Sequence, residues 1–380
     1  MSAWSGLGIS AGVPDGTWTE FLTLDTASIM ASFIPSITRF PKLRLIGEYS
    51  SDNARIGLKL WATALKAHKP DQFIMFGIAS SSSVYLPTFY STYSEKMLID
   101  AQWAQDNLMD QFQIANEFEI SSHRGTLSIS SISRTSNIAT VTTSSIHGLT
   151  TGDTIIISGA SDSSYNVSQV DCTVTGDTTF TYASTGSDGS ASGTLLLKCG
   201  DATLVRFIKI LATQAQAVFT RGPIVYSVSQ GYQTYWTAIT PNTDLDLIGL
   251  NVYGVNSFSE FASTISTMFG VFGTQMIITE FNLHASWSSV SHKGFTPSST
   301  DFDTTYADEA YRRLKYIQNL GIEQAYFFTS WWTAVTTHNA FSIFYDTNAG
   351  GTRVSGNYKS VYDRLLEQRI SHVFFGSQLT

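Results

Sequence analysis

The chain has 380 residues, 43% of them hydrophobic and 13% aromatic, so it can bury a large core in two or three domains or in one barrel with additions. Only 14% of the residues are charged, the net charge is −8, and no Lys/Arg run could follow a phosphate backbone, which argues against a nucleic-acid partner. No run of about 18 apolar residues predicts a membrane span, and the first residues lack a signal-peptide pattern, so we expect a soluble chain with no membrane partner.

Short apolar runs rich in Ile, Val, Phe and Tyr alternate with stretches of helical period, which is typical of βα units around a parallel sheet. Strands are predicted at residues 3–10, 42–50, 72–80, 111–119, 223–230, 245–254, 275–282 and 324–332. Helices are predicted at residues 26–40, 53–69, 94–111, 201–219, 260–272, 304–320 and 357–370, with a short one near 232–240. Eight such units favour a closed (β/α)8 TIM barrel over an open doubly wound sheet, because no Gly-rich phosphate turn follows the first strand.

One segment interrupts the alternation with short Ser/Thr-rich runs of period two. Strands are predicted there at residues 126–134, 137–145, 153–160, 168–176, 178–185 and 193–198. This pattern predicts a β-sandwich-like domain at 123–198, inserted in the loop after strand 4 between barrel parts 1–122 and 199–380. Loops of this kind lie at the face of a barrel where active sites are built, so we expect the insert to form a wall beside the site.

The two cysteines, Cys172 and Cys199, have neither metal-ligand spacing nor a disulfide framework around them. Two interpretations stay open. They either pair in an oxidising compartment or remain buried free thiols.

Two predicted strands end in a carboxylate. The run "QFQIANEFEI" reaches Asn116 and Glu117, and "QMIITEFNLH" reaches Glu280. A carboxylate at the C-terminal end of a barrel strand points into the barrel mouth, where an unpaired charge is costly unless it is used or neutralised. Two of them could lie across a glycosidic bond, one donating a proton and the other attacking the anomeric carbon. The alternative is a structural role, with each carboxylate paired to Arg or Lys.

A family resemblance rests on five of these runs. "LRLIGEY", "IANEFE", "LIGLNVYG", "IITEFN" and "FFTSWW" together resemble the retaining clan A glycoside hydrolases, which include cellulase- and mannanase-like families. The resemblance covers roughly residues 1–120 and 200–380 and leaves the insert out. It implies that Glu117 is the acid/base and Glu280 the nucleophile.

The resemblance implies further site residues. Asn116 would hold the sugar 2-OH, and Arg44 would lie beneath the nucleophile and pair with its charge. Tyr253 would hydrogen-bond the nucleophile, and Trp331, or else Trp332, would form the platform for the reacting sugar ring. The alternatives are a surface arginine, a packed core phenol and tryptophans buried in the core.

The pattern departs from the family at one point. Several families of the clan place a histidine near the end of strand five or six, and this chain has none there, so His284 is a candidate substitute and a surface loop residue is the alternative. Aromatic residues after the fifth and seventh strands, Trp236 with Tyr232, Tyr235 and Trp287, are candidates for further sugar subsites or for packing between loops.

The roles together predict a retaining glycoside hydrolase whose partner is an oligo- or polysaccharide, with no metal and no cofactor. Retention predicts carboxyl groups about 5–5.5 Å apart. The insert run "HGLTTGDTIIISGA" resembles small β-modules of phage tail and other surface-associated proteins, which indicates an extracellular or virion-associated setting. The alternative function is an inactive carbohydrate-binding or virion structural protein on a glycosidase-like barrel. The sugar, the mode of cleavage and the oligomeric state stay open.

Overall fold

The computed structural model describes residues 5–12, 34–35, 37–48, 52–79, 86–120, 124–231, 245–252, 257–281, 300–329 and 365. The helices predicted at 26–40, 232–240 and 357–370 therefore fall mostly or wholly outside the described residues. None of the helices within these ranges is long and apolar enough to cross a lipid bilayer.

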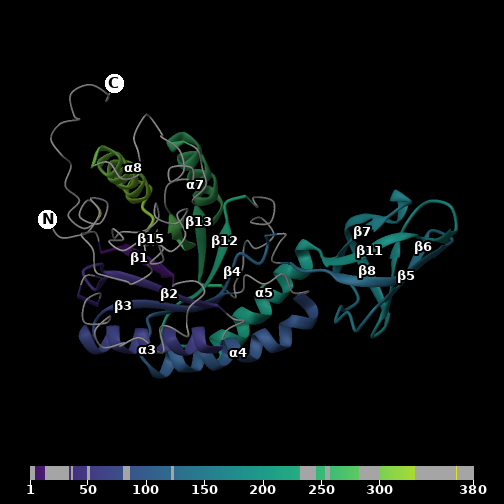
Figure 1. The fold of residues 1–380 in the computed structure, drawn as a ribbon, viewed down its shortest axis with the longest axis horizontal. Helices are drawn as coiled ribbons and strands as arrows, with labels where there is room; N and C mark the ends of the chain where they lie inside the picture. Colours follow the sequence, from purple (N-terminus) through teal and green to yellow (C-terminus); the bar gives the residue numbers. More distant parts are fainter. Residues whose placement is uncertain are drawn as a thin grey trace.

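The centre of the fold is a closed barrel of eight parallel strands, which confirms the predicted TIM barrel (Figure 1). Its strands are β1 (Leu7–Gly12), β2 (Lys42–Glu48), β3 (Phe73–Ala79), β4 (Gln111–Asn116), β12 (Ile224–Ser229), β13 (Leu247–Val252), β14 (Met276–Phe281) and β15 (Ala325–Thr329). Strands β4 and β12 pair directly, although the insert separates them in the sequence. Pairing of β1 with β15 closes the ring.

Helices follow the strands on the outside of the barrel. They are α3 (Asp52–His68), α4 (Leu86–Asp106), α5 (Asp201–Gln216), α7 (Phe258–Phe272) and α8 (Thr300–Asn319), with a short 3-10 turn η2 (Gly273–Gln275) after α7. Helix α4 differs from its prediction because it begins eight residues early, with Pro87 in its first turn, where a missing N–H costs nothing. It ends before Leu108, whose φ of 60° is left-handed.

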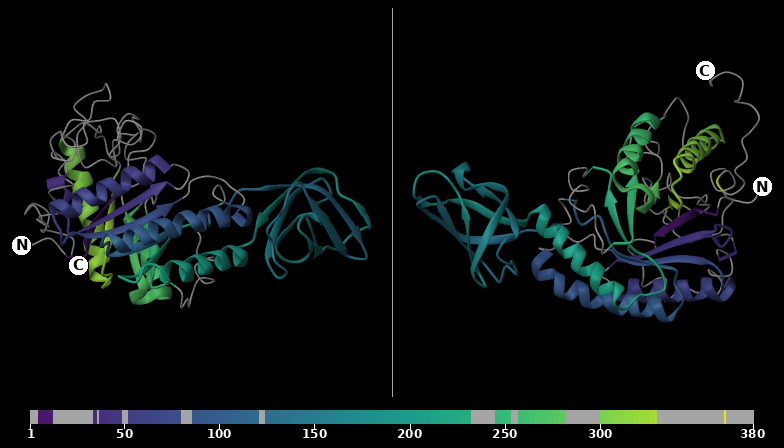
Figure 2. Two further views of the ribbon diagram at one scale, coloured as in Figure 1. Left: turned by 90° about the horizontal axis from the view of Figure 1, so that it is seen from below. Right: turned by 180° about the vertical axis from the view of Figure 1, so that it is seen from behind.

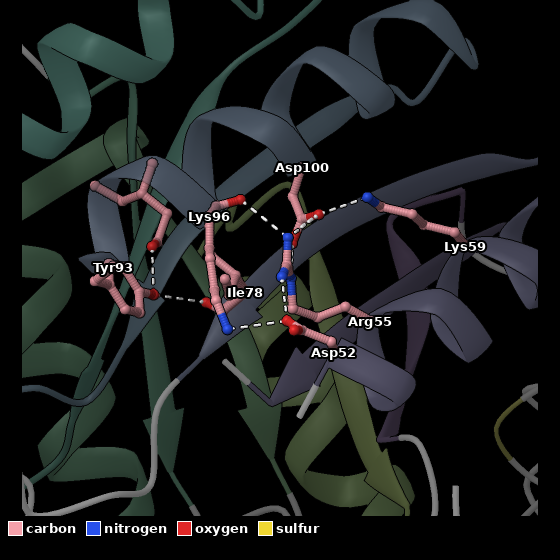
Figure 3. A network of polar contacts seen from close by, with 8 residues as sticks. Asp52, Arg55, Lys59, Ile78, Tyr93, Lys96 and Asp100 are labelled. Carbon is pink, nitrogen blue, oxygen red and sulfur yellow. Dashed lines mark hydrogen bonds and ion pairs between the residues drawn. The ribbon is translucent and has the colours of Figure 1, made fainter. Parts of the chain in front are cut away.

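An ion-pair network centred on the buried Asp100 joins α3 to α4 (Figure 3). Arg55 binds both carboxylate oxygens of Asp100, at 2.7 and 2.9 Å, and Lys59 binds the same carboxylate at 2.7 Å. Asp52 accepts from Arg55 and from Lys96, each at 2.9 Å. Because Asp100 is buried, its charge depends on these partners, and the two helices are held at one spacing.

Helix α4 in turn holds the strands that lead to the barrel mouth. The Tyr93 hydroxyl is 2.8 Å from the carbonyl of Ile114 and 3.3 Å from that of Ile78 (Figure 3). Ile114 lies two residues before the end of β4. The position of the end of β4 is therefore set by α4 as well as by the neighbouring strands.

The inside of the barrel changes from apolar to polar toward its mouth. A small apolar cluster, separate from the core between strands and helices, consists of Met75, Val225, Ile277 and Tyr326. Two buried polar side chains, Ser227 and Thr279, lie two residues further along β12 and β14. Three more lie on the neighbouring strands β2, β4 and β13: Arg44, Gln113 and Asn251. Alternation along each strand brings these residues to the interior, so the mouth has a polar floor.

Gly249 makes room for this polar layer. A Cβ on Gly249 would lie 2.4 Å from Cγ2 of Thr279 and 2.7 Å from Oγ of Ser227. Both distances are well inside van der Waals contact, and the neighbouring strands cannot separate without opening the barrel. Glycine is therefore required at this position.

We expect Gly249→Ala to lower the free energy of unfolding by about 1–3 kcal/mol, because it overpacks the barrel interior. Gly270→Ala is the matched control, since Gly270 lies in α7 with no atom near its Cβ position, and alanine there should be neutral or stabilising by up to about 1 kcal/mol. Urea unfolding followed by circular dichroism measures both. Equal effects of the two substitutions would contradict the packing argument.

The segment after β4 forms an antiparallel sheet of seven strands, β5 (Leu127–Thr135), β6 (Ile138–Thr143), β7 (Thr154–Ala160), β8 (Val167–Gly176), β9 (Thr179–Ala183), β10 (Gly189–Ser190) and β11 (Gly193–Cys199), with a 3-10 turn η1 (Ser163–Tyr165). The strands lie close to the predicted ranges. An additional pairing of β5 with β6 closes the sheet on itself, so the topology is closer to a small barrel than to the predicted sandwich. The domain boundaries stay a prediction.

The cysteines of this segment are both buried and both free, which agrees with the second of the two interpretations. Burial raises the pKa of the Cys172 thiol to about 11, with Asp153 nearby as a second cause. The thiol therefore stays protonated at neutral pH and is a poor nucleophile.

The sheet extends to one side of the barrel and is joined to it through the start of α5 (Figures 1 and 2). Arg206 of α5 binds the buried carboxylate of Asp153 through two N–H groups, at 2.8 and 2.7 Å. Thr203 Oγ1 donates to the carbonyl of Thr154 at 3.0 Å. These contacts attach the sheet to a barrel helix, and its role as a wall beside the site stays a prediction.

The first and last strands of the insert pair with each other, with Leu127 opposite Leu197. Residues directly opposite in an antiparallel pair are about 5 Å apart, so a short Gly/Ser loop that joins Leu127 to Leu197 can replace residues 128–196. We expect the shortened chain to keep cooperative thermal unfolding and barrel circular dichroism. An unfolded product would show that the segment is an integral part of the barrel core.

Candidate active site

Glu117 projects from a sharp turn at the end of β4. The strand ends at Asn116, and Glu117 has a φ of 53°, a left-handed conformation that a side chain with a Cβ rarely takes. Its N–H donates to the carbonyl of Ser227 on β12 at 2.9 Å, and its own carbonyl accepts from Ile120 at 3.2 Å. The predicted strand, 111–119, is therefore three residues too long, because the backbone turns at the residue that carries the carboxylate.

Arg44 lies beneath this turn and connects three strands. Its guanidinium donates to Oε1 of Glu280 on β14 at 2.6 Å, to Oε1 of Gln113 at 2.8 Å and to Oδ1 of Asn116 at 3.0 Å. Arg44 is only 1% exposed, so it is not the surface arginine of the alternative interpretation. It gives the buried Glu280 carboxylate a cationic partner, which is the arrangement that the resemblance implied.

Asn116 is held in one orientation by its carbonyl oxygen. Oδ1 accepts from Arg44, from Gln113 Nε2 at 3.3 Å and from Asn251 Nδ2 at 3.1 Å. Thr279 in turn donates to Oδ1 of Asn251 at 2.7 Å, which fixes that amide as well. Since its oxygen is occupied by donors, Asn116 turns its Nδ2 toward Oε2 of Glu117, 3.5 Å away, at the open end of the barrel.

The two carboxylates have different surroundings. Burial raises the pKa of Glu117 to about 8, and the negative charges of Glu280 and Glu119 contribute, while a hydrogen bond from Asn251 and the charge of Arg44 act against them. Glu280 is bound directly to the guanidinium instead. Glu117 therefore keeps its proton at neutral pH, in a site where its neighbour is an ion-paired carboxylate. The two carboxyl groups are therefore in different electrostatic environments.

No family model matches the chain, and no curated protein matches it. Solved structures match over almost its whole length. A GH113 β-1,4-mannanase has a TM-score of 0.53 at 9% identity, covering 97% of this chain and 98% of its own. A GH113 β-mannanase from Alicyclobacillus acidocaldarius has 0.51 at 9%, covering 97% of each chain. The GH53 catalytic domain of Ignisphaera aggregans has 0.50 at 11%, covering 95% and 96%. The chain has the fold of clan A glycoside hydrolases.

Four of the predicted site residues of this glycosidase-like barrel lie together at its mouth: Arg44, Asn116, Glu117 and Glu280. The other predicted site residues lie outside the described residues, and their roles stay predictions: Tyr253, Trp331, Trp236 and His284, with Tyr232, Tyr235, Trp287 and Trp332. Within the described part of the chain, no three His, Cys, Asp or Glu side chains are arranged to hold a metal ion.

Sequence reasoning missed several polar residues of the site. Gln113 and Asn251 orient Asn116, and Glu119 raises the pKa of Glu117. A signal for Gln113 existed, because a glutamine in the middle of a buried strand requires hydrogen-bond partners. The signal for Asn251 was its place near the end of "LIGLNV", where a barrel strand reaches the mouth.

The raised pKa of Glu117 makes the stability of the fold depend on pH. The folded chain binds this proton more tightly than the unfolded chain, so the free energy of unfolding falls as the pH rises from about 4.5 to about 8. We expect Glu117→Gln to be more stable than wild type at pH 8 by about 1–3 kcal/mol, and the difference to vanish near pH 4.5. Urea unfolding at both pH values measures it.

Glu95→Gln is the control for this experiment, because Glu95 is exposed on α4. Its free energy of unfolding should follow that of the wild type at both pH values. A Glu117→Gln variant that is less stable than wild type at pH 8 would mean that the ionised carboxylate is favoured in the folded chain.

Proposed function

We propose that this chain is a retaining glycoside hydrolase that cleaves β-glycosidic bonds of an oligo- or polysaccharide, with Glu117 as acid/base and Glu280 as nucleophile. The observation that carries the proposal is the asymmetry of the pair. One carboxyl group is buried and keeps its proton at neutral pH, and the other is bound to a guanidinium at 2.6 Å. Barrel glycosidases need this division of roles.

The environment of Glu117 supports its role as the acid. A leaving sugar oxygen needs a proton as the glycosidic bond breaks, and a carboxyl group with a pKa near the working pH is the most effective donor. Burial and the charge of Glu280 give Glu117 this property. Once Glu280 has become an ester, its negative charge is lost, so Glu117 releases its proton more easily and can serve as the base of the second step.

The reaction then follows in two displacements. The Glu280 carboxylate attacks the anomeric carbon and forms an ester bond while the glycosidic C–O bond breaks and Glu117 protonates the departing oxygen. Water enters, Glu117 takes one of its protons, and the resulting hydroxide attacks the anomeric carbon and releases Glu280. Two inversions give net retention. Asn116, held by its oxygen, turns an N–H group toward the site and would bind the sugar 2-OH.

The neighbouring structures named above include β-1,4-mannanases, so β-mannan is the first polymer to test. A panel of β-mannan, β-glucans, xylan and aryl β-glycosides covers the linkages that barrels of this kind cleave.

We expect the wild type to release reducing sugar from at least one member of the panel. Glu117→Gln and Glu280→Gln should each reduce kcat/KM by about a hundredfold or more, because each removes a group that reacts directly. Glu95→Gln should keep full activity. Proton NMR of the first product should show the β-anomer before mutarotation.

The pair of glutamates also allows a rescue experiment. Azide should restore turnover of an aryl glycoside by Glu280→Gly with an inverted product, and by Glu117→Gly with a retained one, because azide then replaces either the nucleophile or the water. If no glycoside is cleaved and glycans still bind, the barrel is a carbohydrate-binding protein and the proposal is wrong.

A further inference from the structure

The turn that carries Glu117 is held by a second buried carboxyl group. Glu119, two residues later, is fully buried. Its Oε2 accepts from the Tyr226 hydroxyl at 2.7 Å, and its Oε1 accepts from the backbone N–H of Ser229. Both partners lie on β12, the strand that follows the insert. Glu119 therefore binds the end of β4 to its neighbour across a gap that no ordinary strand pairing covers, since β4 has ended at Asn116.

Tyr226 completes the contact. Its hydroxyl oxygen accepts from the backbone N–H of Phe118 at 3.0 Å while its proton goes to Glu119. One phenol thus satisfies the backbone of the turn and the carboxyl group together. With the bond from the Glu117 N–H to Ser227, three consecutive residues after β4 are attached to β12. These bonds together hold Glu117 in a left-handed conformation that is unfavourable for a residue with a side chain.

The same residue is joined to the base of the insert. The Glu119 carbonyl accepts from Arg124 Nε at 3.0 Å, and Arg124 forms an ion pair at 2.6 Å with Asp201, the first residue of α5. The chain on both sides of the inserted sheet is therefore anchored to the residue behind Glu117. Glu119 lies where the catalytic turn, β12 and the insert meet.

We propose that Glu119 is a positioning residue for Glu117: together with Tyr226, it holds in place the turn that carries the acid/base. This inference rests on the proposed function of the site, since it assigns a role relative to the proposed acid/base. Glu119 does not reach the mouth itself, because it is fully buried and both of its carboxyl oxygens are bonded to β12.

The electrostatics of the pair agree with this role. Burial raises the pKa of Glu119 to about 7, opposed by its bonds to Ser229 and Tyr226 and by the charge of Arg124. Its negative charge in turn raises the pKa of Glu117, on which Glu280 acts in the same direction and Arg44 and Asn251 in the other. As the pH rises through neutrality, Glu119 ionises first and makes Glu117 hold its proton to a higher pH.

The test is a titration that needs no substrate. Protein labelled with carboxyl-¹³C glutamate is titrated by NMR, and the two signals are assigned by their loss in Glu117→Gln and Glu119→Gln. In Glu119→Gln, which keeps the shape of the side chain, we expect the midpoint of Glu117 to fall by about 0.5–1 pH unit. In any preparation that cleaves a glycoside, the alkaline limb of the pH profile of kcat should move to lower pH by the same amount, with little change in KM.

Tyr226→Phe provides a second variant that removes one hydroxyl and keeps both carboxyl groups. We expect the midpoint of Glu119 to rise, because its ionised form loses a donor, and the Phe118 amide to exchange about five- to tenfold faster. Glu95→Gln should change neither midpoint. If Glu119→Gln fails to fold, the midpoint of Glu119 in Tyr226→Phe still tests whether the bond between Tyr226 and Glu119 holds the turn.

The proposal is overturned if Glu117 keeps its midpoint to within about 0.2 pH unit in folded Glu119→Gln, since loss of the Glu119 charge should lower that midpoint by about 0.5–1 pH unit. It is equally overturned if Tyr226→Phe leaves the Glu119 midpoint and Phe118 exchange unchanged. A wild type that cleaves no glycoside but shows the predicted shifts would refute the proposed function alone, so the two failures are distinguishable.

Discussion

The buried guanidinium of Arg44 is the interaction on which the rest of the site depends. A charge that is only 1% exposed loses its hydration, and the effective cost is several kcal/mol unless partners replace the water. Those partners come from two other strands: Glu280 from β14, and Gln113 with Asn116 from β4. Because β2, β4 and β14 come together only in the closed ring, the Arg44 guanidinium gains these partners only when the barrel closes.

The polar floor of the mouth extends outward from this charge by hydrogen bonds. Gln113 and Asn251 join Arg44 in donating to the oxygen of Asn116, and Thr279 fixes Asn251. Each of these bonds further restricts the orientation of the Asn116 amide. Gly249, which cannot carry a Cβ, gives Thr279 the space that this arrangement requires. Gly249 on β13 thus helps to fix the orientation of Asn116 on β4, two strands away.

The raised pKa of Glu117 depends on burial and on like charges. Glu117 is raised in pKa by removal from water and by Glu280 and Glu119, whereas Glu280 is bound to Arg44. Two identical side chains therefore have different surroundings, because the barrel bonds one to a cation and buries the other beside anionic neighbours. The bonds that attach the β4 turn to β12 maintain this difference, since a small displacement of Glu117 would change both its burial and its distances from the neighbouring charges.

The sequence by itself determined the barrel, the ranges of most strands and the β-rich insert, because hydrophobic period is a local pattern. Of the four residues that meet at the mouth, strand-end position indicated Glu117 and Glu280, and the family resemblance indicated Arg44 and Asn116. The sequence did not determine the early start of α4, the closure of the insert sheet, or the roles of Gln113, Asn251 and Glu119. Only the tertiary structure decided these, since each depends on which side chain lies opposite in another strand. The family resemblance alone suggested different roles for Glu117 and Glu280. The physical cause of the difference is that Glu117 is buried beside negative charges whereas Glu280 contacts a guanidinium, and both conditions exist only once the chain has folded.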